Sequence, residues 1–282
     1  MAAPARPGYG GSCRAARRHR DGEGRGRGNY RHSRRNDHLT TGNTENTESI
    51  FWVSSVIAVV ENLGGDMPAR STWVSRGLLI VGLITALLYI AGAGKSSVVL
   101  SVLLKSVPLV CLIIWVRLTA RDRYATLIFA GLLFSLAGDI LLEISADLFV
   151  PGLIAFLIGH VWYIVAFVSI TRELNWPRLL PFAAWVILAY LLLFPSLKGM
   201  AVPVAAYVIV IGAMMWRSGA LVDQPALRWQ WLALIGAILF GLSDTLLAFK
   251  KFNGLIIGPS FTIMTLYWLG QLGLALSAKR SK

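Results

Sequence analysis

The sequence has 282 residues, of which 56 % are hydrophobic and only 15 % carry a charge, and its mean hydropathy is +0.63. This composition excludes an ordinary water-soluble domain and is typical of a polytopic membrane protein. The formal net charge of +13 would suit nucleic acid, but from Met67 onward the Lys and Arg residues lie almost entirely in short gaps between apolar runs. That distribution is typical of membrane topology, so we predict a lipid bilayer and no nucleic acid as a partner.

Residues 1–66 differ in composition from the rest of the chain. They contain ten Arg and no Lys, with repeated Gly-Arg pairs followed by a stretch rich in Thr, Asn and Glu. Such a segment buries too little apolar surface to fold alone, and its apolar piece at 50–60 is too short to span a bilayer. We therefore expect a disordered Arg-rich extension, or a mis-assigned start with the native start at Met67, and one domain over 67–282.

Eight apolar runs follow, and at about 1.5 Å per residue each is long enough to cross a hydrocarbon core of about 30 Å. Their approximate bounds are 77–93, 97–116, 124–143, 149–170, 178–194, 200–216, 229–249 and 257–277. The connections are too short for a soluble domain, so the helices themselves must carry the function. The sequence therefore predicts an integral, multi-pass, all-α protein with a bundle of eight transmembrane helices.

The third and seventh runs resemble each other in sequence. Ala130–Phe134 matches Gly236–Phe240, and Gly138–Leu142 matches Ser243–Leu247 after a slip of one residue. This similarity suggests a four-plus-four parallel duplication, with chance similarity of apolar strings as the alternative.

The Lys and Arg residues between the runs indicate an orientation. If all eight runs span the membrane, both termini lie on one side, with twelve Lys and Arg residues. The opposite side has only four, which are Lys95, Lys198, Lys250 and Lys251. By the positive-inside rule we expect both termini in the cytoplasm.

Asp139 and Asp244 lie inside apolar runs, in LAGDILL and GLSDTLL. A carboxyl group at this depth is costly unless it is partnered or protonated, which makes both residues candidates for a functional site. Lys105 interrupts the second run at its middle. It either forms a buried salt bridge with Asp139 or Asp244, or also binds a substrate phosphate.

Other polar residues lie on the fourth and eighth runs. His160 and Tyr163 share a helix face with Phe156, and they are either packing residues or groups that orient a proton donor. One stripe of the eighth run contains Ser260, Met264, Tyr267 and Gln271. The Gln271 side chain either forms a hydrogen bond to another helix or contacts the substrate. A single intramembrane His argues against a zinc site.

Glu143 and a set of small residues in the third and seventh runs have structural interpretations. Glu143 lies near a helix end, where we expect it to be solvated. Gly131, Ser135, Gly138, Gly236 and Gly241 are expected to be packing positions that let helix backbones approach closely.

The order and spacing of these motifs resemble the YhhN family of eight-helix membrane proteins, which includes the lysoplasmalogenases. The resemblance covers about residues 75–278 and rests on Lys105 with Pro108, LAGDILL at 136–142, GHVWYI at 159–164, GAILFGLSDTLLA at 236–248, and Tyr267 with Gln271. It implies hydrolysis of the vinyl-ether bond of a lysoplasmalogen, a lysophospholipid, to a fatty aldehyde and a glycerophospho-alcohol. An acid protonates the outer vinyl carbon and water captures the resulting cation, so this reaction requires no metal or cofactor.

The resemblance also suggests roles for the candidate residues. Burial favours the neutral form of a carboxyl group and a neighbouring cation favours the charged form, so one Asp of the pair would be the acid and the other the base. The expected catalytic residues are Asp139, Asp244, His160 and Tyr163, and the expected substrate-binding residues are Lys105, Tyr267, Gln271 and Ser243.

Two other functions remain open at this point. Intramembrane Asp, Lys and His also form proton relays, as in a proton-coupled small-solute transporter. A non-catalytic lipid-binding membrane protein is the third possibility. The sequence does not indicate an oligomeric state.

Overall fold

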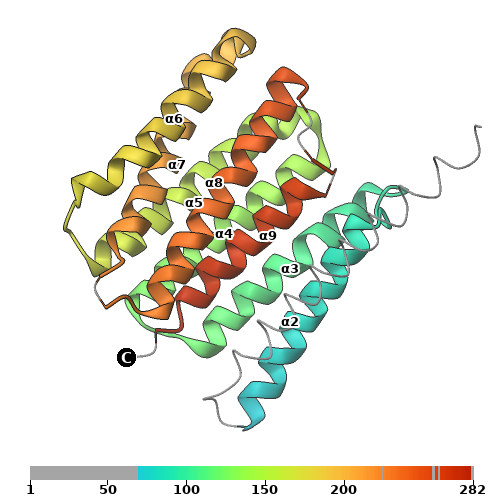
Figure 1. The fold of residues 1–282 in the computed structure, drawn as a ribbon. Helices are drawn as coiled ribbons and strands as arrows, with labels where there is room; N and C mark the ends of the chain where they lie inside the picture. The colour runs from blue at the N-terminus through green and yellow to red at the C-terminus, as the bar shows by residue number, and fades with distance from the viewer. Residues whose placement is uncertain (1–68, 224, 256–257, 260, 281–282) are drawn as a thin grey trace, which may run out of the picture. The chain divides into compact units, whose positions relative to one another are not determined.

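The computed structural model describes residues 69–280, apart from 224, 256, 257 and 260, so the predicted extension lies outside the described residues. Within this range the chain is helical and has no strand (Figure 1). The long helices are α2 (Ala69–Ile90), α3 (Val98–Thr119), α4 (Arg123–Ile144), α5 (Phe149–Ile170), α6 (Leu179–Leu193), α7 (Ala201–Ala220), α8 (Arg228–Ala248) and α9 (Thr262–Ser277). The prediction of an all-α polytopic membrane protein is confirmed.

Seven helical segments in this part of the chain are long and apolar enough to cross a membrane. The remaining helix, α9, has 16 residues, which correspond to about 24 Å at the usual helical rise. The two predicted boundaries that differ most from the structure are both helix starts. The first helix begins at Ala69 rather than residue 77, because its polar first turns continue the helix, and the last begins at Thr262, after the positive-φ Gly258 and Pro259.

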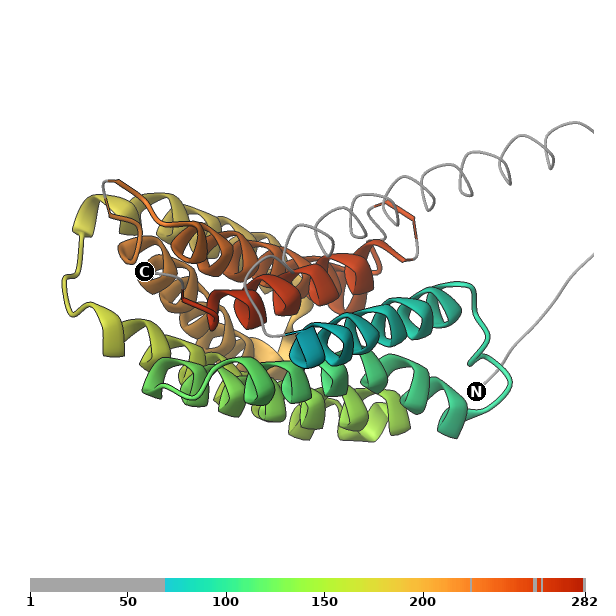
Figure 2. The same ribbon diagram turned by 90° about the horizontal axis from the view of Figure 1, so that it is seen from below.

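The helices pack in two halves of four. In the first half α2 contacts α3, α3 contacts α4 and α4 contacts α5; in the second half α6, α7, α8 and α9 pack in the same sequential order. The halves meet mainly where α5 packs on α7 and where α9 packs on α3, with a smaller contact between α4 and α9. The two main contacts are equivalent if α2–α5 corresponds to α6–α9, as the proposed duplication requires. Figure 2 shows α9 lying between α8 and α3.

Glycines set the closest helix contacts, as the sequence predicted. A methyl group at Gly236 would lie 2.7 Å from the backbone nitrogen of Leu274, so α8 and α9 touch backbone to backbone. On the other hairpin, a methyl group at Gly138 would lie 2.5 Å from the Phe156 ring, so α4 accepts an aromatic side chain of α5 directly against its backbone. Small residues thus bring each Asp-bearing helix close to its neighbour.

An aromatic cluster fills the middle of the bundle around Phe240, which is fully buried. Its ring centroid lies 4.6 Å from that of His160, 5.3 Å from Tyr267 and 6.1 Å from Phe156. These distances are typical of favourable aromatic pairs. The cluster fixes the ring positions of side chains from α5, α8 and α9 next to the polar site.

Candidate active site

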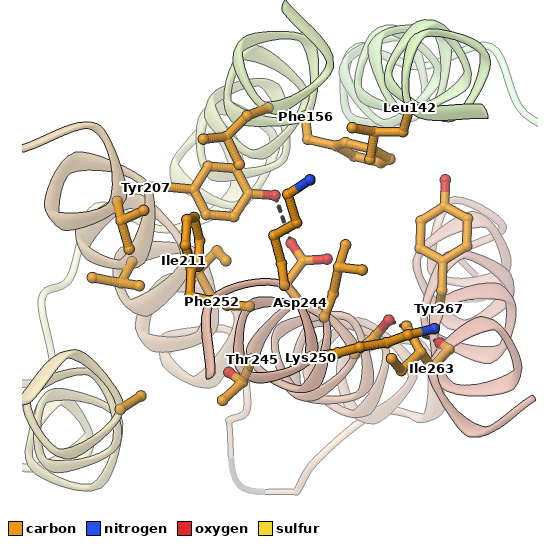
Figure 3. A pocket seen from close by; sticks show the side chains of 18 of the residues that line it. Leu142, Phe156, Tyr207, Ile211, Asp244, Thr245, Lys250, Phe252, Ile263 and Tyr267 are labelled. Carbon is orange, nitrogen blue, oxygen red and sulfur yellow. Dashed lines mark hydrogen bonds between the residues drawn. The ribbon is translucent and has the colours of Figure 1, made fainter. Parts of the chain in front are cut away.

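One cavity of about 390 Å³ is lined by both intramembrane carboxylates. Figure 3 shows Asp244 in this cavity with Tyr207 and Tyr267. Asp139 lies near the end of α4 and Asp244 near the end of α8, whereas Lys105, Tyr207 and Tyr267 lie near the starts of α3, α7 and α9. Because successive helices run in opposite directions, all five side chains lie at one end of the bundle. All five line the cavity.

Asp139 is bound by a phenol and an ammonium group. The Tyr267 hydroxyl donates a hydrogen bond of 2.6 Å to one carboxylate oxygen, and Lys105 Nζ lies 3.6 Å from the other. Asp139 is only 2 % exposed. The ion pair between Lys105 and Asp139 is one of the two arrangements that the sequence suggested for Lys105.

Glu143 is not the solvated helix-end residue that the sequence suggested. Its carboxylate lies 3.2 Å from Lys105 Nζ, and it accepts hydrogen bonds from the hydroxyls of Tyr89, at 3.2 Å, and Ser101. Tyr89 and Ser101 are 54 and 42 residues away in the sequence and belong to α2 and α3, so no local pattern could reveal them. Lys105 is therefore shared by two carboxylates, and its contact with a substrate phosphate stays a prediction.

Asp244 has a different pair of partners. The Tyr207 hydroxyl donates a hydrogen bond of 2.7 Å to Asp244 Oδ2, and His160 Nε2 lies 3.5 Å from the same oxygen. Tyr207 was missed by the sequence interpretation, because a Tyr in an apolar run carries no sign of the carboxylate that will face it from another helix.

The hydrogen bond on the other side of His160 restricts where protons lie. Nδ1 is 2.6 Å from the carbonyl oxygen of Phe156, which can only accept, so Nδ1 carries a hydrogen. If His160 were neutral and Asp244 ionised, the Nε2 lone pair would face a carboxylate oxygen without a proton between them. His160 Nε2 has no hydrogen-bond partner among the described residues, and it is the ring nitrogen that faces the Asp244 carboxyl group.

Tyr163 and Gln271 bind each other and not the carboxylates. The Tyr163 hydroxyl donates a hydrogen bond of 2.8 Å to Gln271 Oε1, and both side chains are fully buried. Neither of them lines the cavity, and nor does His160, which reaches it through Asp244. Ser243 does line it, and its hydroxyl donates to the carbonyl oxygen of Ile263 at 2.9 Å. Ser260 of the predicted stripe lies outside the described residues.

The rest of the cavity lining includes an apolar arm and a basic rim. The apolar arm is formed by Trp185, Val186, Ala189 and Leu193 on α6 with Val204, Val208, Ile211 and Met215 on α7. The basic rim consists of Lys250 and Lys251, in the turn that follows α8. The sequence had indicated these lysines only as topology charges.

A family model described as the YhhN family matches residues 100–278. The chain is 36 % identical over 194 residues to human lysoplasmalogenase TMEM86A, covering 64 % of this chain and 79 % of that protein. It is 33 % identical over 184 residues to mouse lysoplasmalogenase TMEM86B, covering 64 % and 76 % respectively. No solved structure matches the chain.

Proposed function

Because the chain belongs to the YhhN family and its relatives are named lysoplasmalogenases, we propose that it hydrolyses the vinyl-ether bond of lysoplasmalogens. The observation that carries the mechanism is that Asp139 and Asp244 line one cavity with different partners, an ammonium group for Asp139 and an imidazole for Asp244. Two carboxyl groups in unlike surroundings are suited to one acid and one base.

The proposed reaction has three steps. A proton adds to the outer vinyl carbon, and the former double-bond electrons form that C–H bond, which leaves an oxocarbenium ion between the inner carbon and the ether oxygen. Water adds to the inner carbon and loses a proton to a base, giving a hemiacetal. The hemiacetal then loses the glycerol oxygen as an alcohol, which releases the fatty aldehyde and the glycerophospho-alcohol.

We assign the acid to Asp244. His160 Nε2 faces this carboxyl group at 3.5 Å and can supply or take up its proton, and the Tyr207 hydroxyl holds the carboxyl group in place. Proton delivery by Asp244 would leave a carboxylate that Tyr207 and His160 can both stabilise by hydrogen bonds. His160 is therefore a positioning residue and a proton reservoir in this scheme rather than a group that touches substrate.

We assign the base to Asp139. Lys105 and the Tyr267 hydroxyl both favour its carboxylate form, so it can stabilise the oxocarbenium ion and then take a proton from the attacking water. Glu143 shares Lys105 and keeps the ammonium group in position. Ser243 and Tyr267 line the same space and are the proposed contacts for the glycerol unit.

The alkenyl chain is assigned to the apolar arm between α6 and α7. The lining side chains on these two helices are apolar except for two groups, the Tyr207 hydroxyl, which donates to Asp244, and the indole nitrogen of Trp185, which donates to Thr245 Oγ1 at 3.2 Å. The vinyl carbons are the first two carbons of this chain, so a chain in the arm brings the scissile bond to the carboxylates.

The deciding experiment measures aldehyde release by the purified protein from a lysoplasmalogen, with the saturated 1-O-alkyl analogue as the control substrate. The wild type should release aldehyde only from the vinyl ether. Asp139→Asn and Asp244→Asn should each lower the rate about 10²–10⁴-fold, as for loss of a general acid or base, while the protein still inserts and elutes as the wild type does. Absence of aldehyde from the wild type would refute the proposal in favour of a transporter or a non-catalytic lipid-binding protein.

A further inference from the structure

We propose that Lys250 and Lys251 bind the phosphate of the substrate head group at the mouth of the cavity. The inference rests on the proposed function, because it identifies the group that positions a lysophospholipid over the two carboxylates. It replaces the phosphate contact that the sequence had suggested for Lys105.

The local structure places both lysines on the cavity. After Ala248 the backbone of α8 widens into a π-helical turn, Phe249–Asn253, which ends at Gly254 with a φ of 67°. Within this turn the consecutive residues Lys250 and Lys251 both line the cavity that holds Asp244. Single π-helical turns of this kind occur frequently at functional sites.

The two ammonium groups are directed to different helices. Lys251 Nζ lies 4.6 Å from the ring centroid of Phe149, the first residue of α5. A cation over an aromatic face is held in position without losing its charge. The Lys250 side chain extends toward Ile263 and Tyr267 on α9 (Figure 3).

Lys250 and Lys251 differ from Lys105 in their carboxylate partners. Lys105 is buried and faces both Asp139 and Glu143. By contrast, among the described residues no carboxylate lies within ion-pair distance of Lys250 or Lys251, and both side chains are exposed. The mouth of the cavity therefore has two uncompensated positive charges, and a phosphate is the complementary group.

The dimensions of the substrate agree with this placement. In a lysoplasmalogen one glycerol unit separates the vinyl-ether oxygen from the phosphate. Lys250 follows Asp244 by six residues, so its backbone lies about 9 Å further along the helix, a rise comparable with the length of one glycerol phosphate. With the chain in the apolar arm, the head group would face the lysines at the open end.

Lysines at a helix end also anchor proteins at the membrane surface by extending into the head-group region. The matched control for that role is Lys198, an exposed lysine in the turn Lys198–Met200, which does not line the cavity. The variants to compare are Lys250→Gln, Lys251→Gln, the double variant and Lys198→Gln. All are purified in uncharged detergent micelles, so that no bilayer surface contributes to binding.

The experiment uses two substrates, a choline lysoplasmalogen and the corresponding 1-O-alkenylglycerol, which lacks the phosphate. Removal of both charges should raise KM for the lysoplasmalogen about tenfold or more, with kcat nearly unchanged, because a charge-assisted contact is worth about a factor of ten. KM for the alkenylglycerol should not change, and Lys198→Gln should change neither. Equal effects on both substrates, or an unchanged KM for the lysoplasmalogen, would overturn the proposal.

Direct binding of the saturated 1-O-alkyl lysophospholipid separates this proposal from the proposed function, since that ligand cannot be cleaved. One outcome is that the wild type binds this ligand, the double variant binds it about tenfold more weakly, and no aldehyde forms from any substrate. In that case the phosphate site stands and the hydrolase proposal fails. If the double variant forms aldehyde with an unaltered KM and binds the analogue normally, the hydrolase stands and the phosphate site fails. Competition by glycerophosphocholine assigns the site to a lipid head group, whereas competition by inorganic phosphate alone would refute that assignment.

Discussion

Lys105 and Tyr207 contact the two intramembrane carboxylates from corresponding helices of the two halves. Lys105 on α3 faces Asp139 on α4, and Tyr207 on α7 faces Asp244 on α8. The last helix of each half then crosses over: α9 supplies Tyr267 to Asp139, and α5 supplies His160 to Asp244. Corresponding helices of the two halves thus supply the partners of both carboxylates. The partner side chains differ, which makes the two carboxylates chemically unlike.

If Asp139 is the base, a small external carboxylate should partly replace it. Asp139→Ala leaves a gap beside Lys105 that formate can enter, whereas formate at neutral pH cannot supply the proton that Asp244 is proposed to deliver. Formate should therefore restore aldehyde release to Asp139→Ala and not to Asp244→Ala. Rescue of Asp244→Ala alone would reverse the assignment of acid and base.

Tyr207→Phe should lower kcat without preventing folding. It removes the hydroxyl that donates to Asp244, and hydrogen bonds to charged groups contribute about 1.5–3 kcal/mol, which corresponds to roughly a tenfold to hundredfold change in rate. Tyr190→Phe is the control, because the Tyr190 hydroxyl donates to the Ala201 carbonyl and does not line the cavity. Equal kcat values for the two variants would show that the Tyr207 hydroxyl has no part in the reaction.

Lys105→Met should destabilise the protein, because it leaves Asp139 and Glu143 without their shared cation. Removal of one partner from a buried ion pair typically costs about 3–5 kcal/mol. The double variant Lys105→Met with Glu143→Gln should recover part of this loss, since Gln can still accept hydrogen bonds from Tyr89 and Ser101. Thermal unfolding in detergent measures the stability of both variants. A double variant less stable than Lys105→Met would contradict the shared-cation arrangement.

Ala189→Phe should change the preferred chain length of the substrate. Ala189 lines the apolar arm and is 7 % exposed, so a Phe ring there would occupy space assigned to the alkenyl chain. We expect kcat/KM to fall for long-chain lysoplasmalogens and to change much less for short-chain ones. The neighbouring Leu188 is 60 % exposed and does not line the cavity, so Leu188→Phe is the control and should leave the chain-length profile unchanged.

The proposed orientation, with both termini in the cytoplasm, is open to a direct test. Reporter fusions after Lys282 and in the turn at Asp147, between α4 and α5, should give signals from opposite sides of the membrane. The first fusion should report the cytoplasm, as the distribution of Lys and Arg predicts. Signals from the same side would contradict the eight-helix topology.

The sequence predicted those features that an isolated helix can show. Asp139, Asp244 and Lys105 were identified because a charge within an apolar run is costly wherever the helix packs. Tyr207 and Glu143 were missed because their roles depend on which helices become neighbours, and a Tyr or a helix-end Glu is unremarkable alone. Tyr163 and Gln271 were expected at the site from the family resemblance, yet they form a hydrogen bond between α5 and α9 and do not line the cavity.

The backbone contact at Gly236 determines how precisely the site is built. Because α8 and α9 touch without intervening side chains, Asp244 and Tyr267 belong to one rigid hairpin, and Tyr267 also binds Asp139. The spacing of the carboxylates is therefore preorganised by helix packing rather than by loops, and little reorganisation is needed when charge develops in the transition state. A site of this kind is precise but adapts little to change. Even a single added methyl group at Gly236 would push α8 and α9 apart and so disturb the site.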